Sequence, residues 1–255
     1  MKICIDAGHY GKYNRSPANN KYYESDVMWK LHLLQKKYLE EYGFEVVITR
    51  SNQNTDKSLY NRGAMSKGCD LFISDHSNAV GSVTNNKVDY PVVIVPLNKK
   101  GDAIGQRLAE CVEKVMETTQ KGRVTTRAYN GKDYYGVIRG AVAVGTVGVI
   151  IEHSFHTHKR STDWLLNDDN LDKLAKAEAD VIADYFGVAK QKEFKIRVSI
   201  DNLNVRLGAG LSYKKNGYCP KGVYTIVDTQ TKDGYEWGKL KSGIGWIALK
   251  YTERL

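Results

Sequence analysis

Strand and helix signals alternate along residues 1–187, and this alternation is the strongest constraint on the fold. Short β-branched runs such as Phe44–Thr49 and Val147–Glu152 are separated by longer stretches with helical spacing. Asn170–Phe186 is one such stretch, and Gly187 ends it as a helix stop. Strands that alternate with helices indicate an α/β domain. We therefore expect a mainly parallel twisted sheet flanked by helices.

After Gly187 the pattern changes. Val188–Lys195 is polar and reads as a linker between two domains. Residues 196–255 contain short strand-like runs separated by turn signals, which are Leu207–Gly210, Lys221–Gly222, Lys232–Gly234 and Lys241–Gly243. Such a pattern over about 60 residues is typical of a small all-β barrel. We expect a catalytic domain at 1–187, a linker at 188–195 and a barrel at 196–255.

Charge is unevenly distributed along the 255 residues, whose formal net charge is +9. Residues 190–255 hold 13 Lys and Arg against 6 Asp and Glu. This asymmetry predicts a basic module with an anionic partner, either the anionic polymers of a bacterial wall or nucleic acid. The sequence contains no recognised nucleic-acid motif, so we expect no nucleic-acid partner.

Neither a membrane span nor a disulfide framework is expected. No window approaches the roughly 18 consecutive apolar residues of a transmembrane helix. Met1–Asp6 reads as a strand and lacks the features of a secretory signal, so we expect synthesis in the cytoplasm. The four cysteines are widely spaced and form no CxxC, which favours free, mostly buried thiols; they are Cys4, Cys69, Cys111 and Cys219.

Candidate reactive side chains stand where strands are expected to end. His9 follows the first strand, His76 follows Leu71–Ser74, and Glu152 closes another strand. Glu24 lies at the start of the first long helix. In open α/β sheets, ligands bind beyond the carboxyl ends of the strands. Two histidines with one carboxylate can hold a catalytic zinc, and a further carboxylate can take a proton from water.

Residues 1–187 resemble the zinc-dependent N-acetylmuramoyl-L-alanine amidases of the amidase-3 family. The matching motifs, in chain order, are Asp6–His9, Glu24, Thr49-Arg50, Leu59–Arg62, Cys69–Ala79 and Ile151–Phe155. The resemblance implies that His9, Glu24 and His76 bind Zn²⁺ and that Glu152 is the catalytic base. Cys69 replaces the usual alanine of the family, and Asp75 stands where an apolar residue is common.

Other histidines leave a second possibility open. His153, His156 and His158 could form an alternative metal cluster, although no carboxylate ligand is placed by the spacing. We expect them instead to line the substrate cleft or to lie at the surface. His32 falls within a helix and is expected to be structural.

The C-terminal residues resemble bacterial SH3-like domains. The matching segments are Asn202–Gly210, Lys221–Gly222, Tyr235–Leu240 and Gly245–Ile247, with Ala209 in place of the usual proline. This resemblance implies binding to peptidoglycan in the cell wall, and the basic charge suggests the anionic wall polymers as an additional partner. Trp237, Trp246, Tyr224 and Tyr235 are each expected to pack in the core or to form flat contact surfaces.

Together the two resemblances predict a peptidoglycan hydrolase with a wall-binding domain. It would cleave the amide between the lactyl group of N-acetylmuramic acid and the L-alanine of the stem peptide. We expect an endolysin or autolysin that reaches the wall after release at lysis. A zinc peptidase acting within the stem peptide and a non-catalytic wall-binding protein are the alternatives. All four residues of the candidate site are present, which argues against a decayed enzyme.

Overall fold

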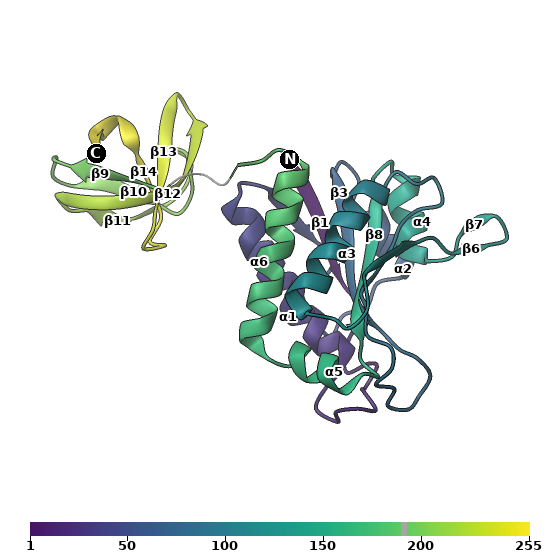
Figure 1. Ribbon diagram of the computed structural model, residues 1–255. Coiled ribbons are helices and arrows are strands. Elements are labelled where there is room, and N and C mark those ends of the chain that lie inside the picture. The colour runs from purple at the N-terminus through teal and green to yellow at the C-terminus, as the bar shows by residue number, and fades with distance from the viewer. Residues whose placement is uncertain (190–192) are drawn as a thin grey trace. The chain divides into compact units, whose positions relative to one another are not determined.

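The structure is a computed structural model that describes residues 1–189 and 193–255 (Figure 1). It divides into two compact units, one built from Met1–Glu40 and Phe44–Val188 and the other from Glu41–Gly43 and Ala189–Leu255. No helix in the described part of the chain is long and apolar enough to span a membrane.

A six-stranded sheet forms the centre of the first unit. Its order is β2 (Glu45–Ile48), β1 (Lys2–Ala7), β3 (Leu71–Asn78), β8 (Gly148–Phe155), β4 (Val92–Ile94) and β5 (Arg123–Thr125). Neighbouring strands are parallel except for β4 and β8, which are antiparallel. The expected mainly parallel sheet is thus a mixed sheet with one antiparallel pair.

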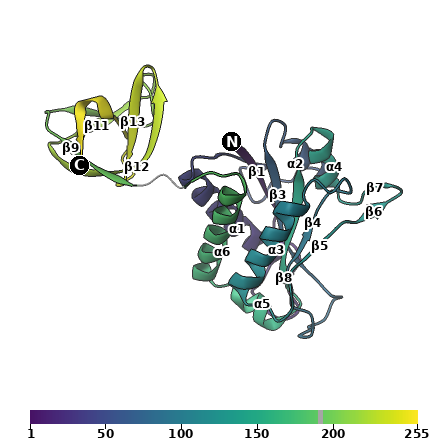
Figure 2. The ribbon, with the colours of Figure 1, turned by 45° about the horizontal axis from the view of Figure 1, so that its top comes forward.

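Helices cover both faces of this sheet (Figure 2). On one face lie α1 (Glu24–Glu41), α3 (Asp102–Met116) and α6 (Asp168–Tyr185). On the other lie α2 (Leu59–Ala64) and α4 (Gly136–Ala143), and the short α5 (Lys159–Leu165) precedes α6. The face under α4 is apolar, because Phe72, Ile150 and Ile138 pack there in one buried cluster.

Glycine lets α2 and α4 pack unusually close together. A Cβ atom at Gly63 would overlap the main-chain carbonyl oxygen of Val137, and one at Gly140 would overlap that of Tyr60. Neither position can therefore accept a side chain without moving a helix. The close packing fixes Leu59 and Val137, which stand at one edge of the candidate site.

A two-stranded hairpin stands apart from the main sheet. It consists of β6 (Ala128–Tyr129) and β7 (Lys132–Asp133), joined by Asn130 and Gly131. Both turn residues have positive φ, 49° and 71°, which is the conformation that an Asn-Gly hairpin turn requires. The alternating strand and helix pattern of the sequence predicted neither this hairpin nor β5, α4 or α5.

The described residues of the second unit form a sheet of seven antiparallel strands. Their order is β11 (Lys215–Cys219), β10 (Leu203–Arg206), β14 (Trp246–Ala248), β13 (Tyr235–Leu240), β12 (Gly222–Lys232), β9 (Phe194–Val198) and β15 (Thr252–Arg254). A single 3-10 turn, Leu249–Tyr251, precedes β15. Trp237 and Trp246 are buried here, so both pack in the core.

The first strand of this unit begins earlier than the predicted linker allows. The expected linker was 188–195, of which residues 190–192 lie outside the described residues. Phe194 and Lys195 already belong to β9 and pair with Ile226 and Thr225 of β12. Phe194 also packs against the apolar core, which explains why the strand starts there.

The four cysteines are free, and three of them are buried.

Candidate active site

The loop after β1 and the strand β3 bring two histidines together. His9 adopts a left-handed backbone with φ 60°, which turns the chain sharply as it leaves the sheet. A Cβ atom at the preceding Gly8 would lie 2.5 Å from Cε1 of His76, so only glycine leaves room for that ring. The two imidazole rings lie edge to face with centroids 5.0 Å apart.

Glu24, the first residue of α1, lies between these histidines and is almost fully buried. Its Oε1 lies 2.9 Å from Nδ1 of His76, and its Oε2 lies 3.3 Å from Nε2 of His9. The amide of Ser77 and the side chain of Asn14 also donate to its carboxylate. Burial would raise the pKa of Glu24, but these histidines hold it well below its usual range.

These three side chains fit a divalent metal ion. One ligand atom from each of His9, Glu24 and His76 lies within 4.8 Å of the other two. In the described residues, this is the only such group of histidine, cysteine and acidic side chains. Two imidazoles and an ionised carboxylate are donors that zinc prefers. The three residues predicted from sequence to bind metal therefore converge.

Glu152 lies beside this cluster on the next strand. It pairs with His76 in the register of β3 and β8, so both side chains project from the same face of the sheet. Its Oε2 is buried and has no hydrogen-bond partner among the described residues. Burial raises the pKa of Glu152 to about 7, with nearby His76 lowering it and Glu24 raising it. An uncommitted carboxylate oxygen with a near-neutral pKa suits a proton acceptor.

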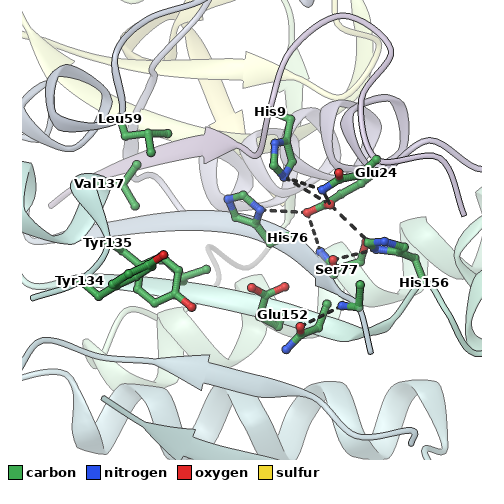
Figure 3. Close-up of a pocket in the computed structure, with 15 residues that line it drawn as sticks. His9, Glu24, Leu59, His76, Ser77, Tyr134, Tyr135, Val137, Glu152 and His156 are labelled. Atoms are coloured by element: carbon green, nitrogen blue, oxygen red, sulfur yellow. Dashed lines mark hydrogen bonds and ion pairs between the residues drawn. The ribbon is translucent and has the colours of Figure 1, made fainter. Parts of the chain in front are cut away.

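All four side chains open into one pocket of about 420 Å³ (Figure 3). Of its remaining lining, only His156 was expected from the sequence as a cleft residue. The others come from several elements and are Asn14, Leu59, Ser77, Asn78, Ala79, Tyr134, Tyr135, Gly136, Val137 and Ile150. Leu59, Asn78 and Ala79 belong to the recognised motifs, and this was the sequence signal that could have predicted their place in the pocket. Asn14, Tyr134 and Tyr135 lie outside these motifs, so no sequence signal placed them in the pocket.

Two buried arginines hold the loop that carries His9. Arg62 of α2 donates to the carbonyl oxygens of Ala7 and His9 at 3.1 and 3.3 Å. Arg50 donates to the carbonyl oxygen of Ala7 at 2.6 Å. Charged donors to main-chain oxygens are stronger than neutral ones, so these bonds fix the loop's path. This explains why Thr49-Arg50 and Leu59–Arg62 belong to the recognised pattern.

The other three histidines of the chain's second half occupy separate places. His156 lines the pocket, with Nδ1 3.9 Å from Oε2 of Glu24, and burial lowers its pKa. His153 is fully buried on the opposite face of β8. His158 caps α5 by accepting from the amide of Ser161. They form no common metal cluster within residues 1–189 and 193–255.

A buried polar network supports the two strands from behind. His153 lies 3.0 Å from the carbonyl oxygen of His76 and 2.8 Å from Oε1 of Glu178 on α6. Gln35 of α1 donates to both Glu178 and Asp75, at 2.8 and 3.1 Å. Burial would lower the pKa of His153, but Glu178 raises it to about 9. Asp75, the departure noted in the sequence, therefore belongs to this network.

Comparison with known proteins agrees with this geometry. Residues 3–184 match the family model described as N-acetylmuramoyl-L-alanine amidase. The chain is 23% identical over 211 residues to N-acetylmuramoyl-L-alanine amidase CwlM of Bacillus licheniformis, covering 82% of this chain and 78% of that protein.

Solved structures share the fold. The catalytic domain of CwlV from Bacillus (Paenibacillus) polymyxa var. colistinus superposes with a TM-score of 0.62 at 20% identity, covering 74% of this chain and all of that one. AmiC2 of Nostoc punctiforme also gives 0.62, at 21% identity, covering 73% of this chain and 97% of its own.

Proposed function

The chain belongs to the family of N-acetylmuramoyl-L-alanine amidases, and from this premise we propose that it is a zinc-dependent peptidoglycan hydrolase. It cleaves the amide between the lactyl group of N-acetylmuramic acid and the L-alanine of the stem peptide. The observation that carries the proposal is the convergence of His9, Glu24 and His76 beside the unpartnered carboxylate of Glu152.

Each residue has a distinct part in this reaction. His9, Glu24 and His76 would hold the zinc, which, when bound, polarises a carbonyl group and lowers the pKa of water. Glu152 accepts a proton from the attacking water on its free Oε2 and passes it to the nitrogen of the departing L-alanine. Because Glu152 lies opposite His76 on the adjacent strand, its carboxylate projects from the same face of the sheet as this metal-holding histidine.

Mass spectrometry of digested, purified cell wall together with metal analysis tests this proposal. We expect free lactyl groups on muramic acid, free amino termini on L-alanine, and one zinc per chain. New termini inside the stem peptide would instead show a zinc peptidase. Zinc without any cleavage product would favour a non-catalytic wall-binding protein.

We also propose that the second unit is an SH3-like domain that binds peptidoglycan and the anionic polymers of the wall. Its long strand β12 pairs with β9 along its first half and with β13 along its second, with a register shift after Ile226. A strand that bends from one partner to another in this way suits a small barrel. The excess of basic residues over 190–255 favours an anionic ligand.

Sedimentation with purified walls tests the second unit. A labelled 190–255 fragment should pellet with walls, less so at high salt or after removal of the anionic polymers, because exposed charges are screened over about 8 Å at physiological ionic strength. Failure to pellet under every condition would contradict the binding role.

We further propose that the enzyme acts on the wall after release at lysis, and culture fractionation before and after lysis tests this.

A further inference from the structure

The pocket has two unlike walls on either side of the candidate metal ligands and Glu152 (Figure 3). On one side stand polar groups, among them Asn14, Ser77 and His156. On the other stand Leu59, Val137 and the rings of Tyr134 and Tyr135. A substrate cleaved between these walls would therefore meet polar contacts with one half and apolar, aromatic contacts with the other.

The aromatic wall is held in place before any ligand arrives. The rings of Tyr134 and Tyr135 lie edge to face at 5.1 Å, and the guanidinium of Arg127 lies 3.9 Å from the centre of the Tyr134 ring. Arg139 of α4 donates to the carbonyl oxygens of Asp133 and Tyr134 at 2.8 and 2.6 Å. A preformed surface loses little conformational entropy on binding.

Aromatic rings continue from the pocket onto the β6–β7 hairpin. Tyr129 lies edge to face with Tyr134 at 6.5 Å. Tyr129 is 66% exposed and Tyr134 is 43% exposed, so the hairpin presents ring surface to solvent. The side chain of Asp133 anchors the hairpin by accepting from the amide of Leu97 at 2.8 Å. The hairpin is thus an anchored arm that extends the aromatic wall outward.

The chemistry of this wall distinguishes the two halves of the substrate. A pyranose ring presents C–H groups of partial positive charge, which fit the negative face of an aromatic ring. A stem peptide presents amides and carboxylates, which need donors. The arginines at the aromatic wall are already engaged with the hairpin's own rings and carbonyl oxygens. On the opposite wall, Asn14 and the amide of Ser77 already donate to Glu24, and the imidazole of His156 is the further polar group that can meet the peptide.

We propose that Tyr134 and Tyr135 form the subsite for the N-acetylmuramoyl sugar, and that Tyr129 takes the next sugar of the glycan strand. This inference rests on the proposed function, because it assigns one half of that substrate to one wall of the pocket. The peptide half then lies along Asn14, Ser77 and His156, with the scissile amide between them.

Binding to the Glu152→Gln variant tests the subsite without turnover. Three ligands are titrated by calorimetry: the stem peptide alone, the same peptide on N-acetylmuramic acid, and that compound extended by N-acetylglucosamine. Adding Tyr134→Ala should weaken both sugar-bearing ligands by about three- to tenfold, the usual size of one aromatic contact, and should leave the peptide alone unchanged. Tyr129→Ala should weaken only the disaccharide ligand.

Tyr134→Phe is the matched control and should bind like the parent, because stacking uses the ring and not the hydroxyl. Equal weakening of the peptide alone would overturn the assignment and place the peptide on this wall. Unchanged binding of all three ligands after Tyr134→Ala is added would overturn the subsite, and the proposed function would stand if the unsubstituted enzyme still cleaves muramoyl peptides. If the unsubstituted enzyme cleaves no muramoyl peptide, the proposed function fails, and the sugar subsite fails with it.

Discussion

Strands β3 and β8 present two very different faces, although each face is built from neighbouring residues. His76 and Glu152 point into the pocket, where Oε2 of Glu152 has no partner in the described part of the chain. Asp75 and His153, one position away, point to the opposite face among Gln35 and Glu178. Because successive side chains of a strand alternate, one strand pair supplies both the reactive groups and their support.

On each of these strands, the residue proposed to take part in the reaction is directly next to a residue that supports the fold. The pocket face keeps a buried carboxylate that is costly to the fold and useful for chemistry. On the opposite face His153 and Glu178 lie 2.8 Å apart, and Asp75, whose Oδ2 is also buried without a hydrogen-bond partner in the described residues, lies 3.9 Å from the same histidine. Substitutions on the pocket face should therefore affect catalysis, and those on the opposite face should affect stability first.

The largest effect should come from removing a metal ligand. His76→Ala should lose most of its zinc and nearly all activity, because two remaining ligands cannot hold zinc as three do. His156→Ala is the control, since His156 lines the same pocket but lies outside the metal cluster. Elemental analysis of both purified proteins is the measurement. Full zinc occupancy in His76→Ala would disprove the ligand assignment.

Glu152→Gln should separate binding from chemistry. We expect the variant to keep its zinc and to lose about 10²- to 10⁴-fold in kcat, the usual contribution of a general base. It should be at least as stable as the parent, because a neutral amide costs less to bury than a carboxylate without a partner. Steady-state kinetics and urea unfolding measure both effects. Loss of zinc in this variant would make Glu152 a ligand instead.

His153→Leu should show the reverse pattern on the opposite face. Removing one partner of a buried ion pair leaves Glu178 unpaired and should lower the free energy of unfolding by about 3–5 kcal/mol. The double variant His153→Leu/Glu178→Leu should recover part of that loss, because Glu178 is then no longer stranded and only Asp75 remains without its histidine. Urea unfolding tests this, with zinc content as a second readout. A double variant less stable than the single one would contradict the ion-pair explanation.

His32 gives the smallest effect and sharpens the contrast with His153. Burial lowers the pKa of His32 from 6.5 to about 4, partly offset by its bond to the carbonyl oxygen of Trp29. Between pH 6.5 and about 4, His32 is therefore protonated in the unfolded chain and neutral in the folded chain. Stability should fall as the pH drops from about 6.5 to about 4, by about 3 kcal/mol from this group.

A variant lacking this histidine isolates that contribution. His32→Gln should show a smaller loss of unfolding free energy than the parent over the same pH range, since the other titrating groups are common to both proteins. Unfolding curves at pH 7 and pH 4 give the comparison. Identical losses in the two proteins would show that His32 does not control acid stability.

Much of the catalytic unit could be predicted from the sequence, because its long elements carry strong periodic signals. The long helix expected to start at Glu24 is α1, Glu24–Glu41, and the strand expected at Leu71–Ser74 is the start of β3. The strand extends to Asn78 because its polar end finds partners in the folded protein, such as Glu24 for Ser77. The short helix α4 contains two glycines and gave no comparable signal.

The sequence by itself predicted the candidate metal ligands and the candidate base, because these groups stand within motifs that depend on local geometry. The glycine before His9 is one example, since it must lack a side chain to admit the ring of His76. The tertiary structure alone decided what surrounds them. Asn14, Tyr134 and His156 reach one pocket from three distant segments, and His153 meets Glu178 across 25 positions of chain. Such contacts form only when the sheet and its helices close, because no local pattern encodes a long-range distance.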